Sequence, residues 1–450
     1  MFNKVLVANR GAVAARVIRC LKQLGCRAVA VYSEADAGAP YLAEADESHL
    51  LGPAAPQESY LNQDALIEVV RRSGADALHP GYGFLSENAA FALRVMGEGC
   101  AFIGPSPKWL ETMGHKTQAR ELMQKHGMPM CAGSGVLHED EAHEAQIVAE
   151  ARRIGFPVLI KPAGGGGGIG MMAAADEAAL LKALGRSRAL AARSFSVPDV
   201  YLEKLLRNPR HIEFQVIADN YGAVHHLYER ECSVQRRHQK VIEEAPAPGV
   251  PREQVEALGR DITRILADIG YDNIGTVEML RADDGTFSFL EMNTRLQVEH
   301  AVTEGVTGID LVAVQIRAAA GEPLREILPE RIPFQGHALE ARVYAEDPKK
   351  FFPSPGPLER FRPPQERHVR VETGYGEGMI VTPYYDPLLA KVIVRGQTRA
   401  EALEALVGAL EAFEIVGVKT NIPFLLQVLA HPAFREGNVH TGLTAEVLAR

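Results

Sequence analysis

Apolar and polar positions along the first third of the chain alternate as they do when strands and helices follow one another. Residues Lys4–Ala8 form a short apolar run, Ala12–Leu24 repeats apolar side chains at helical spacing, and Ala28–Tyr32 is a second apolar run. Gly25 lies where the helix is expected to end. Two strands joined by one helix over this length predict a parallel sheet with crossover helices.

The pattern changes near residue 115. A strand ending in Lys161 runs directly into a series of glycines. From residue 200 to 300 the alternation predicts antiparallel strands joined by turns, at 219–222 and 282–285. After about residue 335 a mixed segment is expected, with strands at 337–344, 369–372 and 390–394, a Pro-rich linker at 353–364 and a helix at 400–412.

Composition narrows the class of protein. A chain of 450 residues predicts about three domains, and 46% hydrophobic with 23% charged residues is the balance of a globular protein with a large core. A net charge of −9 argues against binding along nucleic acid, which needs a basic surface. No apolar run approaches the ~18 residues of a membrane helix. The five cysteines form no CxxC pair and the N-terminus shows no signal pattern, so we expect a cytoplasmic protein, with an organelle matrix as the alternative if a transit peptide has been removed.

The glycine run, Gly164–Gly168, has two interpretations. It could be a flexible linker, or a lid whose backbone N–H groups cover a phosphate. An apolar strand precedes it, and Ile169, Met171 and Met172 follow, which favours the lid. Lys161 would then place a positive charge near the phosphate, although no Walker GK[ST] motif follows.

A predicted hairpin carries two carboxylates, Glu278 and Glu291. With a two-residue loop they face each other directly, and with a four-residue loop Glu291 faces Thr276, on the same face as Glu278. An odd loop would place the carboxylates on opposite faces. Together with Asn293 they would form an oxygen site for a hard cation such as Mg²⁺. The alternative is a solvent-facing hairpin with ordinary surface acids.

Residues 293–300 would extend this strand. If they stay extended, Asn293, Arg295, Gln297 and Glu299 point the same way. The arginine fork would bind an oxyanion, and Glu299 could accept its proton. A charged edge strand is the other interpretation.

A basic cluster follows the strand expected near residue 230. Arg236, Arg237, His238 and Lys240 gather in an acidic chain and indicate an anion site, with a solvated charge run as the alternative. Cys232 is expected to be buried and inert. The histidines of this region lack zinc-ligand spacing.

Several blocks of the chain together resemble biotin carboxylase, the ATP-grasp component of biotin-dependent carboxylases such as acetyl-CoA carboxylase. The resemblance is carried by residues 8–11, 79–88, 102–105, 160–161 with the glycines, 230–240, 243–248 and 291–300. It implies a multidomain α/β and α+β fold. The implied parts are a Rossmann-like N-terminal domain (1–114), an ATP-grasp domain (115–334, with a lid at about 132–204) and a C-terminal α+β biotin carboxylase domain (335–450).

The resemblance also implies roles for matching positions. Those matching nucleotide contacts are Lys116, Lys161, Gly166, Gly167, Gly168, Met171, Glu203, Lys204, Leu206, His211, Gln235, His238 and Leu280. Those matching metal ligands are Glu278, Glu291 and Asn293. Those matching the bicarbonate pocket are Lys240, Arg295, Gln297 and Val298, with Glu299 as general base. Those matching the biotin end are Arg342, for the enolate, and Tyr82.

The implied activity is the ATP-dependent carboxylation of biotin by bicarbonate, through carboxyphosphate, with Mg²⁺ or Mn²⁺. The implied partners are a biotin carboxyl carrier protein or domain and a carboxyltransferase on other chains, and a second copy of this chain in a homodimer. No biotinyl-lysine motif of the Met-Lys-Met type occurs. The chain departs from the pattern at Pro162, Ile169 and Met172, where the lid is less basic than expected. The alternatives are another ATP-grasp carboxylate–amine ligase and a catalytically weakened nucleotide-binding subunit.

Overall fold

The computed structural model describes residues 1–138, 144–163, 170–195 and 197–449. Its N-terminal part is built on a five-stranded parallel sheet in the order β3-β2-β1-β4-β5. Apolar side chains are buried on both faces of this sheet, which explains the nearly continuous apolar strands in the sequence. The strands are β1 Lys4–Val7, β2 Arg27–Ser33, β3 Glu47–Gly52, β4 Ala77–His79 and β5 Ala101–Phe102.

Local sequence signals place the helices around this sheet. The helix α3 begins after Asn62, whose side chain accepts a hydrogen bond from the Ala65 N–H, and it ends at Gly74 in the left-handed conformation. The helices of this part are α1 Gly11–Gln23, α2 Pro40–Glu44, α3 Gln63–Ser73, α4 Ala89–Gly97 and α5 Pro107–Gly114, with the 3₁₀ turns η1 Glu34–Asp36 and η2 Pro56–Glu58. The α/β prediction for this region is confirmed.

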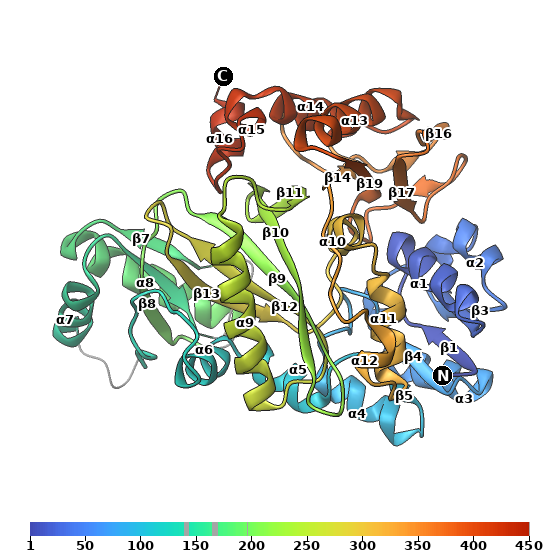
Figure 1. Cartoon of the computed structure of the whole chain (residues 1–450), viewed down its shortest axis with the longest axis horizontal. Helices are drawn as coiled ribbons and strands as arrows, with labels where there is room; N and C mark the ends of the chain where they lie inside the picture. The colour runs from blue at the N-terminus through green and yellow to red at the C-terminus, as the bar shows by residue number, and fades with distance from the viewer. Residues whose placement is uncertain (139–143, 164–169, 196, 450) are drawn as a thin grey trace.

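An eight-stranded antiparallel sheet runs through the middle of the molecule and on into its C-terminal part (Figure 1), in the order β13-β12-β9-β10-β11-β14-β19-β17. The neighbours β11 and β14 pair from Ile242↔Ala341 to Ala245↔Ala338, so one sheet serves both parts. The strands are β9 Arg210–Ala218, β10 Val224–Arg236, β11 Gln239–Ala245, β12 Asn273–Arg281, β13 Phe287–Asn293, β14 His337–Tyr344, β17 Val369–Thr373 and β19 Leu388–Gly396.

A separate three-stranded sheet, β7-β6-β8, lies at the far side of the molecule from the N-terminal sheet (Figure 1). It has its own small apolar core against α7 and α8. Gly164–Ile169, and with them the predicted site residues Gly166, Gly167 and Gly168, lie outside the described residues. The elements here are α6 Lys116–Lys125, α7 Glu144–Ile154, β6 Val158–Pro162, β7 Met172–Ala174, α8 Glu177–Phe195 and β8 Val200–Lys204.

The C-terminal part packs helices on the end of the large sheet around a core of its own. The segment expected as a Pro-rich linker instead contains two short strands. Each belongs to a two-stranded sheet, in which every strand is an edge, so a proline such as Pro357 in β15 is tolerated. The remaining strands are β15 Gly356–Pro357, β16 Arg360–Arg362, β18 Ile380–Val381 and β20 Glu414–Val416. The remaining helices are α9 Arg252–Ile269, α10 His300–Thr307, α11 Leu311–Ala319, α12 Leu324–Ile327, α13 Arg399–Ala412, α14 Ile422–Ala430, α15 Pro432–Arg435 and α16 Leu443–Leu448.

None of the helices in the described part of the chain is long and apolar enough to cross a lipid bilayer.

Candidate functional site

A cavity of about 780 Å³ lies between the three-stranded sheet and the eight-stranded sheet. It gathers side chains that are far apart in the sequence, from Lys116 to Ala445. Its lining includes these residues predicted from the sequence: Lys116, Lys161, Met171, Glu203, Lys204, Leu206, His211, Gln235, His238, Lys240, Glu278, Leu280, Glu291, Asn293, Arg295, Gln297, Val298, Glu299 and Arg342. Among the described residues that the sequence predicted for the site, Tyr82 is not part of the lining.

The two carboxylates of the hairpin do face each other. Glu278 pairs with Glu291 across β12 and β13, and Thr276 pairs with Asn293. The expected even loop is wrong, because Arg281 pairs with Phe287 and leaves five residues, 282–286, in the loop. Glu278 pairs with Glu291 but Met279 pairs with Phe289, so β13 has one extra residue in a β-bulge at this point. The extra residue brings Glu278 and Glu291 back to the same face of the sheet. An odd loop and a bulge together therefore give the arrangement that the sequence predicted with an even loop alone.

The ammonium group of Lys240 lies among three carboxylates. Its Nζ donates to Glu213 at 2.5 Å, to Glu299 at 2.6 Å and to Glu278 at 2.9 Å. A lysine has three N–H donors, so each donor has one carboxylate. Burial alone would lower the pKa of Lys240, but these three carboxylates outweigh it and hold the pKa well above its ordinary value. Lys240 is therefore a fixed positive charge at the centre of the site.

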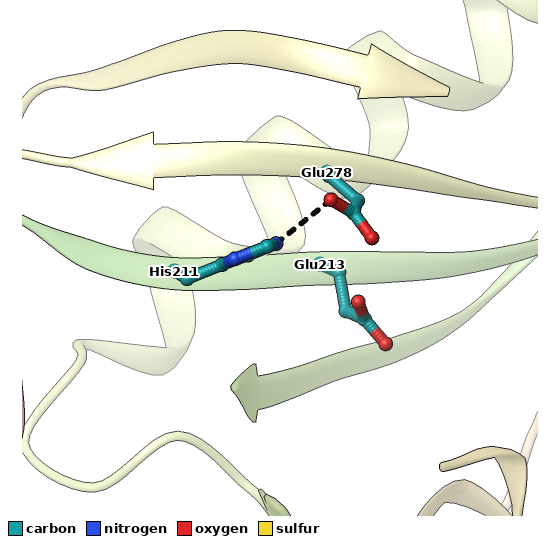
Figure 2. Close-up of side chains that lie close together, drawn as sticks. All are labelled: His211, Glu213 and Glu278. Atoms are coloured by element: carbon teal, nitrogen blue, oxygen red, sulfur yellow. Dashed lines mark ion pairs between the residues drawn. The ribbon is translucent and has the colours of Figure 1, made fainter. Parts of the chain in front are cut away.

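His211 and Glu213 lie on β9 and Glu278 lies on the neighbouring β12, with the His211 ring directed at the Glu278 carboxylate (Figure 2). Their ligand atoms lie within 4.8 Å of one another, as in a group that could hold a metal ion. In this arrangement, however, the Lys240 ammonium already bonds both carboxylates and takes the place of a cation. His211 Nδ1 lies 2.6 Å from the Gln235 amide nitrogen, and its Nε2 lies 3.0 Å from Glu278.

Glu278 is nearly buried and is surrounded by donors. Besides Lys240 and His211, the amide of Asn293 donates to it at 2.9 Å and that of Gln297 at 3.3 Å. Burial alone would raise the pKa of Glu278, but Lys240 and His211 outweigh burial, and the pKa is lowered. Its partner across the hairpin, Glu291, accepts from Lys116 at 2.6 Å. The cations that pair with Glu278 and Glu291 come from outside the hairpin, Lys240 from β11 and Lys116 from α6.

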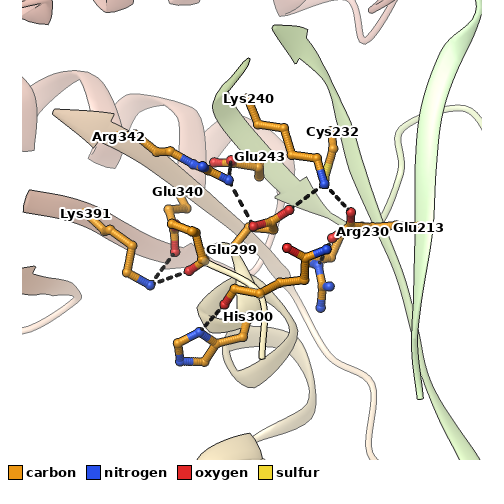
Figure 3. A network of polar contacts seen from close by, with 12 residues as sticks. Glu213, Arg230, Cys232, Lys240, Glu243, Glu299, His300, Glu340, Arg342 and Lys391 are labelled. Carbon is orange, nitrogen blue, oxygen red and sulfur yellow. Dashed lines mark hydrogen bonds and ion pairs between the residues drawn. The ribbon is translucent and has the colours of Figure 1, made fainter. Parts of the chain in front are cut away.

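Glu299 bridges two cations (Figure 3). One carboxylate oxygen accepts from Lys240 and the other from Arg342 at 2.9 Å, while Arg342 also pairs with Glu243 at 2.5 Å. Burial would raise the pKa of Glu299, whereas Lys240, Arg342 and Arg230 lower it, with the result well below the ordinary value. Glu299 is therefore ionised at neutral pH, as a proton acceptor must be.

The segment 294–299 is not the extended strand that the sequence predicted. β13 ends at Asn293, and residues 294–299 adopt neither strand nor helix before α10 begins at His300. Leu296 turns into the core and is fully buried. Even so, Arg295, Gln297 and Glu299 all reach the cavity, because the turn before α10 replaces the strand alternation. Arg295 is held by Glu87 at 2.8 Å and by Gln297 at 2.7 Å.

At the other end of the cavity, Lys161 and Arg120 both pair with the buried carboxylate of Glu203. The next residue, Lys204, directs its ammonium away from the cavity and donates to the carbonyls of Gly155 and Phe156, both at 2.8 Å. Its backbone, rather than its charged group, therefore lines the cavity. Lys161 thus has one carboxylate partner, Glu203. A phosphate bound next to Lys161 would share the lysine with that carboxylate.

The basic cluster separates into two groups. Arg236 is buried away from the cavity, where it donates to Glu346 at 2.8 Å and stacks 4.3 Å over the Phe351 ring. Arg237 and His238 form the tight turn between β10 and β11, both with positive φ, and line the cavity. Arg237, His238 and Lys240 of the predicted anion site thus line the cavity, whereas Arg236 does not, because the turn reverses the chain after it.

We expect Arg236→Leu to lower the free energy of unfolding by roughly 2–3 kcal/mol, since a charge-assisted hydrogen bond and a ring contact are lost. The apparent KM for nucleotide should stay the same. Chemical denaturation and steady-state kinetics measure the two effects. Arg237→Asn is the matched control: it removes the same charge, and asparagine tolerates positive φ, so stability should be preserved. Equal destabilisation by both variants would contradict this placement of Arg236.

Sequence reasoning missed parts of the site that come from distant segments. Four residues at and before the last helix line the cavity: Thr441, Gly442, Thr444 and Ala445. The Thr444 hydroxyl donates to the Gln235 carbonyl. No motif marked them. Glu213 and Glu243 were signalled only by polar positions within buried strands, and both prove fully buried beside the site cations. Cys232 is fully buried, as expected, and burial raises the pKa of its thiol.

Family models match nearly the whole chain. Models described as biotin carboxylase, N-terminal domain, and biotin carboxylase C-terminal domain match residues 1–110 and 340–446. Between them, a model described as carbamoyl-phosphate synthase L chain, ATP binding domain, matches residues 115–327.

Named relatives are similar over nearly their full length. Biotin carboxylase of Halalkalibacterium halodurans is 49% identical over 100% of this chain and 98% of that protein. Biotin carboxylase 2 of Bacillus subtilis is also 49% identical, over 98% of this chain and 98% of that protein.

Solved structures have the same fold. The biotin carboxylase domain dimer of 2-oxoglutarate carboxylase from Hydrogenobacter thermophilus, in complex with MgADP, ADP and bicarbonate, superposes with a TM-score of 0.93 at 43% identity, covering 100% of this chain and 99% of that one. Biotin carboxylase of Campylobacter jejuni superposes with a TM-score of 0.94 at 41% identity, covering 99% of both chains. With its N-terminal, ATP-grasp and C-terminal parts in this order, the chain belongs to the biotin carboxylase family of ATP-dependent ligases.

Proposed function

We propose that this chain carboxylates biotin carried on a separate protein, using ATP and bicarbonate, with carboxyphosphate as the intermediate. The observation that carries the proposal is the arrangement of one cavity. An ionised carboxylate, Glu299, lies between Lys240 and Arg342 at one end, and the facing pair Glu278 and Glu291 lies between it and the Lys161 end. Base, anion-binding cations and acidic pair thus share one space.

The residues divide the proposed site into regions. The nucleotide would lie along Lys116, Lys161, Met171, the 203–206 segment, His211, Gln235, His238 and Leu280. The ranges 1–114, 115–334 and 335–450 are our proposal for the domains. Glu278 and Glu291 fit a hard cation because their carboxylates face each other across the hairpin. The Asn293 oxygen, which accepts from Arg295 at 3.0 Å, would supply a third ligand once released from that arginine. Mg²⁺ or Mn²⁺ bound there would offset charge between the phosphates.

In the proposed reaction, Lys240, Arg295, Gln297 and Val298 hold bicarbonate and Glu299 removes its proton. The bicarbonate oxygen then attacks the γ-phosphorus of ATP, the bond to ADP breaks, and carboxyphosphate forms. Carboxyphosphate divides into CO₂ and phosphate, and phosphate takes the proton from N1′ of biotin. Arg342 stabilises the ureido oxyanion while N1′ attacks CO₂. Because Arg342 and Lys240 are already fixed by carboxylates, little reorganisation is needed.

Tyr82 is proposed at the biotin end, although it lies outside the cavity lining. Its backbone carbonyl accepts from Asn9 at 2.8 Å, which fixes the segment that carries it. The Arg342 charge acts on its phenol, although burial dominates and raises the pKa of Tyr82. The phenol of Tyr82 is therefore close enough to Arg342 for the two groups to interact, which supports its assignment to the biotin end.

One assay tests the proposed function. Bicarbonate-dependent ATP hydrolysis that rises with free biotin supports it. ATP cleavage that needs an amine and another carboxylate, but not bicarbonate, would indicate a different ATP-grasp ligase. Nucleotide binding without cleavage under any of these conditions would indicate a weakened nucleotide-binding subunit. The proposed partners, a carrier protein, a carboxyltransferase and a second copy of this chain, follow from the same function.

We expect no covalent biotin on this chain, because it has no biotinyl-lysine motif of the Met-Lys-Met type. Intact-mass spectrometry of protein produced with an active biotin ligase should give the unmodified mass of the chain. A purified biotin carrier domain made in the same cells is the positive control. A biotin adduct on a lysine of this chain would overturn the view that the carrier is separate.

A further inference from the structure

The segment 294–299 carries four residues of the proposed bicarbonate pocket without the support of a strand or helix. Its backbone must therefore be held by contacts from outside. Two consecutive carbonyls are held in this way: His300 Nδ1 is 2.8 Å from the Gln297 oxygen, and Lys391 Nζ donates to the Val298 oxygen at 2.5 Å. Neither His300 nor Lys391 belongs to the described lining of the cavity, so both hold the segment from its buried side.

Lys391 is fully buried, which is unusual for a lysine. It lies on β19, directly opposite Arg342 on β14 and Glu372 on β17. Its ammonium contacts Glu340 at 3.4 Å (Figure 3). It also contacts Glu372 at 2.7 Å, besides the Val298 carbonyl. The two carboxylates offset the desolvation cost of burying this charge. The third N–H of the ammonium donates to the Val298 carbonyl in the backbone of the pocket.

We infer that Lys391 is a positioning residue that fixes the Val298–Glu299 peptide of the bicarbonate pocket; this inference rests on the proposed function. A peptide unit is planar and trans, so holding the Val298 carbonyl also sets the direction of the Glu299 N–H, on the opposite side. The same holds for the Gln297 carbonyl and the Val298 N–H. Both N–H groups then point away from the buried side of the segment. Because the Val298–Glu299 peptide plane includes the Cα of Glu299, the position from which the Glu299 side chain extends is also fixed.

The charge of Lys391 matters to this role. A charge-assisted hydrogen bond to a carbonyl is about twice as strong as a neutral one, so the segment is held more firmly than by a neutral side chain. Burial, together with the neighbouring carboxylates, raises the pKa of Glu340 to about 8. Lys391 and Arg342 act in the opposite direction but do not outweigh burial. Glu372 instead has a pKa well below its ordinary value, because Lys391, Arg370, His300 and Arg16 outweigh burial. Glu372 is thus the ionised partner, and Glu340 can be made neutral at little cost.

This difference supplies the test. Lys391→Met alone removes a buried charge and could prevent folding, so it is combined with Glu340→Gln, which removes a neighbouring carboxylate. The ionised Glu372 keeps its ion pair with Arg370 in this double variant. Glu340→Gln alone is the matched control, since it leaves the Lys391–Val298 contact in place. Lys391→Arg keeps the charge and a donor. Bicarbonate-dependent ATP hydrolysis is measured for each while bicarbonate and ATP are varied separately.

We expect the double variant to lose about 10- to 100-fold in kcat/KM for bicarbonate, as a displaced binding segment typically does, with the KM for ATP unchanged. Glu340→Gln should behave as the unaltered chain, and Lys391→Arg should recover part of the loss. An equal change in the KM for ATP and for bicarbonate, or a double variant that matches Glu340→Gln, would overturn the positioning role. If the unaltered chain itself shows no bicarbonate-dependent hydrolysis, the proposed function fails, and the inference fails with it.

Discussion

Replacing Glu299 by glutamine should lower bicarbonate-dependent ATP hydrolysis by about 100- to 10,000-fold, the usual contribution of general-base catalysis. The carboxylate is almost completely buried and its two oxygens face Lys240 and Arg342. An amide has one acceptor and one donor end, so it cannot take a proton and must turn N–H groups toward one of the two cations. The dissociation constant of ATP, measured by titration calorimetry, should change little.

The matched control for this variant is Glu243→Gln. Glu243 is buried and also pairs with Arg342, at 2.5 Å, but it is not among the described residues that line the cavity. It should therefore lose far less activity than Glu299→Gln. Equal losses would mean that both acids act only by holding Arg342. A large rise in the ATP dissociation constant with unchanged turnover would instead place Glu299 among the nucleotide contacts.

The pH profile adds a separate check on Glu299. Its pKa lies well below the ordinary value of a glutamate, so the group stays ionised as the pH falls through about 4.3, where a free glutamate is half protonated. Loss of activity on the acid side should therefore come from another group.

Glu278→Gln should lower Mg²⁺-dependent ATP cleavage by at least about 100-fold, because coordination of the metal contributes several kcal/mol to the transition state. The structure adds a second reason: Glu278 accepts from Lys240, Asn293 and Gln297 and pairs with His211. A glutamine at this position would place its own N–H group among these N–H donors, so that donors would face one another. Turnover is measured against Mg²⁺ and Mn²⁺ concentration, with circular dichroism to confirm that the fold is retained.

Asp283→Asn is the control for Glu278→Gln. Asp283 is an acid in the loop of the same hairpin, but it is exposed and lies outside the cavity lining. It should leave the metal dependence unchanged. Near-normal turnover of Glu278→Gln, with the same Mg²⁺ dependence as the unaltered chain, would show that the metal assignment is wrong.

The sequence predicted the elements and the composition of the site well because both depend on local patterns. The parallel N-terminal sheet followed from apolar runs at helix and strand spacing, and β14 was predicted to the residue. The facing carboxylates were predicted correctly for an incomplete reason. Strand alternation gives the parity of a hairpin, but a β-bulge changes that parity, and bulges leave little mark in a single sequence.

What the sequence could not give depends on contacts between distant segments. In the sequence, Arg236 cannot be distinguished from its neighbours Arg237 and Lys240. In the fold, the tight turn directs Arg236 toward Glu346. The acids that fix the site cations, Glu213 and Glu243, look like ordinary polar strand positions because their partners lie on other strands. Polar residues on both faces of a strand usually indicate solvent, whereas here they indicate a buried ionic network.

The eight-stranded sheet has a consequence for how members of this family can exchange parts. The backbone ladder from Ile242↔Ala341 to Ala245↔Ala338 crosses the point where the central and C-terminal parts meet, and it includes the facing carboxylates Glu243 and Glu340. A chain cut near residue 334 would expose the edge of β11, with unpaired N–H and C=O groups, to other chains. The C-terminal part is therefore not a module that recombines freely. A chimaera would have to inherit both strands, with their buried charges, from the same parent.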